Sequence, residues 1–79
     1  MVADFFFSPS VVTVLPGGTV EWTWAPGSAA HNITFNDGSP GRGNQTQGSF
    51  SRTFPTAGSF PYFCSNHEGM SGRVDVIGL

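Results

Sequence analysis

The chain has 79 residues, a formal net charge of −2 and only 10% charged residues, so we expect one domain over residues 1–79. Its basic residues, Arg42, Arg52 and Arg73, do not cluster, which argues against a nucleic-acid partner. No apolar run approaches the ~20 residues of a membrane-spanning helix. The start Met1-Val-Ala-Asp4 has no signal-peptide pattern, and we interpret the chain as a mature domain in preference to a cytosolic protein.

The predicted elements are short β-strands. Apolar stretches alternate with Gly, Pro, Asn and Ser in a chain that holds 11 Gly and 8 Phe, a pattern typical of an all-β sandwich or barrel. The stretch 36–48 is polar and without periodicity, which predicts a mobile surface loop. We expect no helix longer than one turn. The predicted strands lie at residues 4–7, 11–15, 19–24, 31–36, 50–54, 60–64 and 72–77.

The alternation of residues along these strands indicates which side chains face the core. In the strand at 31–36, His31 is in phase with Ile33 and Phe35. In the strand at 60–64, Cys64 is in phase with Phe60 and Tyr62. Because successive side chains of a strand point to opposite faces, His31 and Cys64 are predicted to lie at strand ends on the core side.

The chemistry of the chain concentrates in the segment FPYFCSNHEGM at residues 60–70. Cys64, His67 and Met70 follow one another at intervals of three, and Gly69 favours a tight bend between them. Thiolate, imidazole and thioether form a soft donor set that suits copper as Cu(I) and Cu(II). A trigonal site with an axial methionine needs a second imidazole, and His31 is the only other histidine.

The sequence resembles the cupredoxins, the family of plastocyanin, pseudoazurin and amicyanin. The resemblance is carried by FSPSVVTVLPGGTVEWTW, by HNITF and by GSFPYFCSNHEGMSGRVDV with its short C-x-x-H-x-x-M spacing. It implies a Greek-key β-sandwich or barrel of about seven to eight strands. It also implies one copper ion, Cu(II) or Cu(I), held by His31, Cys64, His67 and Met70.

The same resemblance implies a blue copper electron-transfer protein rather than an enzyme. From this resemblance we expect a monomer in the periplasm or another extracytoplasmic space. Its donor and acceptor redox proteins dock transiently near His67. The surface there is expected to consist of small or apolar residues such as Pro26, Gly69 and Met70.

Two neighbours of the ligands also stand out by resemblance. Asn32 matches the family asparagine that ties the two ligand loops, here through Ser65. Asn66 stands where many relatives have proline, and its backbone N–H is expected to be an additional donor to the Cys64 sulfur.

Four alternatives remain open at the level of sequence. The same ligands would serve a copper carrier or storage protein. A metal-free interaction domain would simply bury Cys64. A zinc site would use Cys64, His31, His67 and Glu68. The chain is also compatible with one domain of a larger oxidase or reductase.

Overall fold

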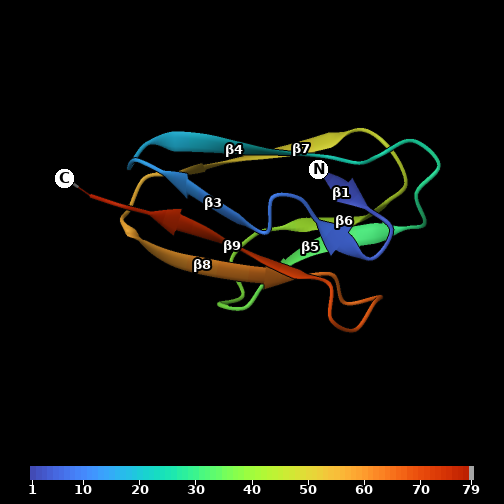
Figure 1. The fold of residues 1–79 in the computed structure, drawn as a ribbon. Helices are drawn as coiled ribbons and strands as arrows, with labels where there is room; N and C mark the ends of the chain where they lie inside the picture. Colours follow the sequence, from blue (N-terminus) through green and yellow to red (C-terminus); the bar gives the residue numbers. More distant parts are fainter. Residues whose placement is uncertain (79) are drawn as a thin grey trace.

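The computed structural model describes residues 1–78, which contain nine β-strands and no helix (Figure 1). The expected all-β class is confirmed, with a strand count slightly above the predicted one. Correspondingly, no membrane-spanning helix is found in this part of the chain. The strands are β1 (Val2–Ala3), β2 (Phe6–Phe7), β3 (Val11–Val14), β4 (Gly18–Thr23), β5 (His31–Phe35), β6 (Arg42–Gln45), β7 (Ser49–Phe54), β8 (Gly58–Phe63) and β9 (Ser71–Val76).

The strands form an elongated sandwich of 39 × 21 × 19 Å. One layer is a five-stranded sheet in the order β3-β9-β8-β5-β6, in which β3 and β9 pair in parallel. The antiparallel pair β4-β7 forms the other layer (Figure 1). The short hairpin β1-β2 is attached by a parallel bridge between Val2 and Trp24.

The core between the layers is aromatic. Trp22 from β4 meets Phe35 and Tyr62 edge-on, with ring centroids 6.0 and 5.4 Å apart. Trp24 lies in the same phase and is also buried, as the alternation in 19–24 predicts. Edge-to-face packing of large rings suits a small domain, because each ring removes a large apolar area from water.

Two predicted segments differ from the structure. Residues 4–7 are not one strand, because Asp4 and Phe5 form a turn between β1 and β2, with Phe5 at φ 72°. The stretch 36–48 is not all loop, because it contains β6. This strand, with the sequence RGNQ, lies at the sheet edge and pairs with β5 through an irregular register. Three of its four residues are exposed, so it lacks the apolar alternation by which a strand is recognised.

The pairing of the strands brings several loops and strand ends together at one end of the molecule. β5 and β8 pair antiparallel, with Thr34 opposite Phe63 and Phe35 opposite Tyr62, so the start of β5 lies beside the end of β8. The β8–β9 loop and the β1-β2 hairpin lie at the same end (Figure 1). Residues that are far apart in the sequence therefore meet there.

Candidate metal centre

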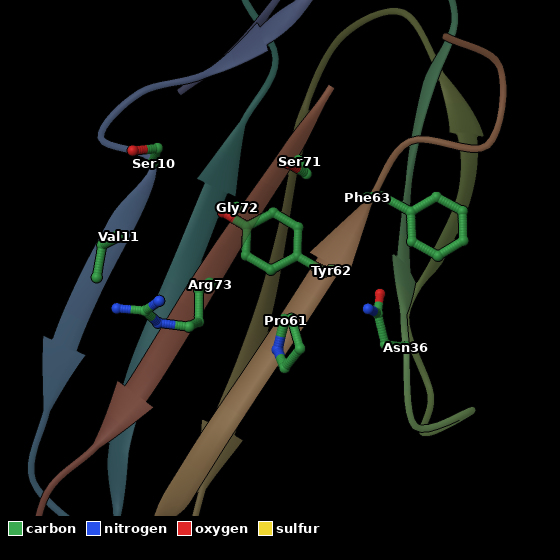
Figure 2. A pocket seen from close by; sticks show the side chains of 9 residues that line it. All are labelled: Ser10, Val11, Asn36, Pro61, Tyr62, Phe63, Ser71, Gly72 and Arg73. Atoms are coloured by element: carbon green, nitrogen blue, oxygen red, sulfur yellow. The ribbon is translucent and has the colours of Figure 1, made fainter. Parts of the chain in front are cut away.

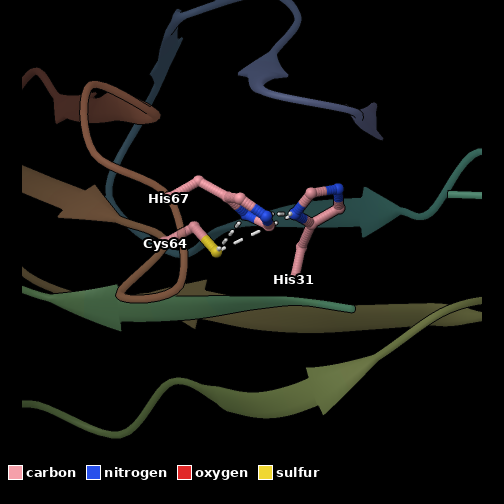
Figure 3. Close-up of side chains that lie close together, drawn as sticks. All are labelled: His31, Cys64 and His67. Carbon is pink, nitrogen blue, oxygen red and sulfur yellow. Dashed lines mark hydrogen bonds between the residues drawn. The ribbon is translucent and has the colours of Figure 1, made fainter. Parts of the chain in front are cut away.

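Three metal-ligating side chains converge at this end (Figure 3). Nδ1 of His31 lies 3.2 Å from Nδ1 of His67. The Cys64 sulfur lies 3.9 Å from the first of these nitrogens and 3.7 Å from the second. His31 is 0% exposed, Cys64 is 2% exposed and His67 is half-buried. The three potential ligand atoms thus form a compact, largely buried triangle.

Local backbone geometry explains the convergence. His31 opens β5 on its core side, in phase with buried Ile33, as predicted. Cys64 directly follows β8 and begins a loop of two tight turns, in which the amide of His67 donates to the Cys64 carbonyl and that of Met70 donates to the His67 carbonyl. The amide of Cys64 donates to the Met70 carbonyl at 3.0 Å, and Gly69 supplies φ 81°.

Met70 is buried within this closed loop, with 1% of its surface exposed. The expectation that Met70 forms part of the exposed surface near His67 is therefore wrong. The backbone places it directly beside Cys64.

The triangle fits a first-row metal ion. Three donors at bond lengths of about 2.0–2.3 Å and 120° to one another are separated by about 3.5–3.8 Å, close to the observed separations. The donors are one cysteine sulfur and two imidazole nitrogens, the donor types of a copper electron-transfer site. Glu68 is exposed and does not belong to the cluster, so the described residues give no carboxylate ligand for the zinc alternative.

Asn32 connects the two ligand-bearing segments. Its backbone amide donates to the Cys64 sulfur at 3.4 Å. Its side-chain Nδ2 donates to the Ser65 hydroxyl at 2.9 Å, and its Oδ1 accepts from the Ser65 amide at 3.1 Å. The predicted tie through Ser65 is confirmed.

Asn66 contributes through its side chain rather than its backbone. Nδ2 of Asn66 donates to the Ala30 carbonyl at 3.1 Å and to Oδ1 of Asn44 at 2.8 Å. Within residues 1–78 no hydrogen bond runs from its backbone N–H to the sulfur, contrary to the expectation. Asn44 also accepts from Nδ2 of Asn32, so β6 joins the same network.

Sequence reasoning missed the contribution of the β1-β2 turn. Oδ1 of Asp4 lies 3.0 Å from Nε2 of His31 and accepts from the Ala29 amide at 2.8 Å. The Ala29 bond, followed by the bond with His31, lowers the pKa of Asp4. The Phe5 ring meets the His67 ring edge-on at 4.9 Å. No motif marks these two residues, because DFFF has the apolar character of a strand.

A separate groove of about 560 Å³ opens on the outward face of β8 and β9 (Figure 2). Its lining includes Pro61, Phe63 and Arg73, and it holds no cysteine or histidine. Among the described residues, His31, Cys64 and His67 form the only group of three or more His, Cys, Asp or Glu side chains close enough to hold a metal ion.

Comparison with known proteins agrees with this geometry. The family model for copper binding proteins of the plastocyanin/azurin family matches residues 2–77. Plastocyanin of Scenedesmus fuscus is 34% identical, over 89% of this chain and 85% of its own. Chloroplastic plastocyanin of Tetradesmus obliquus is also 34% identical, over 89% of this chain and 57% of its own.

The structural comparisons give the same result. An oxidized mutant of amicyanin superimposes with a TM-score of 0.85 at 26% identity, covering 96% of this chain and 77% of the other. Oxidized plastocyanin of Dryopteris crassirhizoma has a TM-score of 0.79 at 28% identity, covering 94% of this chain and 90% of the other.

Proposed function

The chain belongs to the plastocyanin/azurin family of copper-binding proteins, and from this premise we propose how its residues serve a one-copper, blue electron-transfer site. The ligands we assign are His31, Cys64, His67 and Met70. The observation that supports this most strongly is the triangle of two imidazole nitrogens and one sulfur within 4.8 Å of one another.

When bound, copper supplies the Cu(II)/Cu(I) couple that accepts and releases one electron. The chain itself restricts the movement of the ligands. His31 is fixed on a strand, and the Cys64 sulfur accepts a hydrogen bond from the Asn32 amide. The turns from Cys64 to Met70 close the ligand loop. A ligand set that cannot rearrange changes little between oxidation states, which favours fast electron exchange.

His67 is the ligand through which electrons enter and leave in this proposal. It is half-buried, whereas His31 and Cys64 are not accessible to solvent. A donor and an acceptor redox protein would dock transiently at its ring, through a small interface of the kind that weak redox complexes use. We further infer that residues 1–79 act as a single, monomeric, non-catalytic domain in the periplasm or another extracytoplasmic space.

The copper-carrier alternative predicts a different behaviour with the same ligands. A carrier must exchange its metal quickly, whereas this ligand set is largely buried, and hydrogen bonds between Asn32 and Ser65 join the two segments that carry it. In competition with a copper chelator, we expect slow release of the ion. Release as fast as mixing would favour the carrier.

A visible spectrum with added Cu(II) tests the ligand assignment. The wild-type protein should turn intensely blue, because the colour arises from the bond between Cys64 thiolate and Cu(II). Cys64→Ser should remove the colour, and His67→Ala and Met70→Ala should change it. Glu68→Gln is the matched control in the same loop and should leave the spectrum unchanged. A colourless wild-type protein would refute the assignment.

A further inference from the structure

The β1-β2 turn contacts both ligand imidazoles from outside the ligand segments. Asp4 holds the first ring by the 3.0 Å contact between its Oδ1 and Nε2 of His31. The next residue, Phe5, lies against the second ring, with centroids 4.9 Å apart and planes at 67°. Two consecutive side chains thus contact the two histidines, and Asp4 does so at Nε2, the nitrogen of His31 that is not part of the triangle.

The contact from Asp4 selects one tautomer of the neutral His31 ring. A carboxylate oxygen can only accept, so Nε2 must carry the hydrogen and donate it. In the neutral ring, Nδ1, the atom that faces Cys64 and His67, then carries no hydrogen and presents its lone pair to them. A carboxylate behind a metal-binding imidazole also makes the imidazole a stronger donor.

The backbone conformation of the turn indicates that contacts with the surrounding structure hold Asp4 and Phe5 in place. Phe5 adopts φ 72°, a region that non-glycine residues occupy infrequently. Such residues persist where the surrounding structure dictates their position, and they concentrate at functional sites. Phe5 is nonetheless 63% exposed, so core packing does not account for its conformation.

We propose that Asp4 is a positioning residue of the copper site, which orients His31 and, through its negative charge, favours Cu(II) over Cu(I). This inference rests on the ligand assignment proposed above. The charge of Asp4 is transmitted through the imidazole, and a more electron-rich ligand stabilises the more highly charged ion. The native reduction potential is therefore lower than the ligand set alone would give.

The test compares three variants with the wild-type protein, at one pH near neutrality. Asp4→Ala removes the acceptor and the charge. Asp4→Asn keeps an oxygen acceptor for His31 and Ala29 but removes the charge. Asp37→Asn removes an equal charge near the opposite end of β5, where Asp37 bonds Ser39. The measurements are the Cu(II) and Cu(I) affinities, the reduction potential, and the His31 tautomer by nitrogen NMR of the metal-free protein.

In Asp4→Ala we expect Cu(II) affinity to fall about 10- to 100-fold, the typical effect of losing such a partner, with a smaller change for Cu(I). Each tenfold loss of Cu(II) affinity relative to Cu(I) affinity raises the reduction potential by about 59 mV. Asp4→Asn should keep the Nε2–H tautomer and still raise the potential, and Asp37→Asn should leave both unchanged.

A potential in Asp4→Asn equal to that of the wild type would overturn the inference, as would a wild-type His31 that carries its hydrogen on Nδ1. Failure of the ligand assignment has a different signature, because the wild-type protein would then not turn blue. Asp4→Asn keeps both hydrogen bonds, so it remains informative even if Asp4→Ala does not fold.

Discussion

At the residue scale, Asn32 is the side chain on which the two ligand segments depend. Its Nδ2 donates twice, to Asn44 and Ser65, and its Oδ1 accepts twice, from the Thr34 hydroxyl and the Ser65 amide. An asparagine amide offers two donors and two acceptor lone pairs, so its capacity is fully used at a position that is only 5% exposed.

Replacing Asn32 should therefore be costly. Asn32→Ala removes four hydrogen bonds at a position that is 5% exposed, and we expect a loss of about 1–3 kcal/mol in the free energy of unfolding. Denaturant unfolding of the metal-free protein measures it. Asn44→Ala removes a neighbour in the same network at an exposed position and should cost clearly less. If both variants lost the same free energy of unfolding, Asn32 would not be the residue that holds the network together.

At the element scale, the turn of the β1-β2 hairpin places Phe5 in a left-handed backbone conformation that is unfavourable for a residue with a side chain. For a residue with a Cβ, the left-handed region costs roughly 1–2 kcal/mol, whereas glycine enters it freely. Phe5→Gly should accordingly be more stable than Phe5→Ala by about 1 kcal/mol, since both variants lose the ring but only one keeps the strain. Thermal unfolding of the two variants gives the difference.

Phe6 provides the matched control for this comparison. It lies one position later, in β2, is also exposed, and is not among the residues with positive φ. In an ordinary strand glycine is the worse residue, so Phe6→Ala should be more stable than Phe6→Gly. The same order at both positions would show that the conformation of Phe5 carries no strain.

The hairpin also shows where sequence reasoning reaches its limit. The strands around His31 and Cys64 were predictable, because short runs rich in aromatic and β-branched residues, bounded by Gly, Asn or Ser, are typical of strands. The approach of His31, Cys64 and His67 to one another was predictable, because the C-x-x-H-x-x-M spacing and the upstream HNITF resemble a known family. The turn at Asp4 and Phe5 was not, since a positive φ usually selects glycine or asparagine. β6 was not predictable either, because an edge strand of polar residues has no periodic pattern.

At the scale of the whole molecule, the ion we assign would join segments that the sequence separates widely. His31 belongs to β5, whereas Cys64, His67 and Met70 belong to the loop between β8 and β9. The chain has a single cysteine, so no internal disulfide can link them. A domain of this size buries only about 60% of its unfolded surface and is marginal, so a cross-link at this end contributes a large share of its stability.

Copper should therefore raise the melting temperature strongly. A ligand at 100 times its dissociation constant stabilises the folded state by about 2.7 kcal/mol. For a domain of 60–100 residues each kcal/mol corresponds to about 4–8 °C, so removal of copper should lower Tm by roughly 10–20 °C. Calorimetry with and without the metal measures the shift, and Cys64→Ser is the control that should lose most of it. Residual binding of copper to the cysteine and histidines of the unfolded chain reduces the shift. An unchanged Tm in a blue wild-type protein would mean that copper binds the unfolded chain about as tightly as the folded one, because an ion that binds only the folded state must raise Tm however rigid the metal-free pocket is.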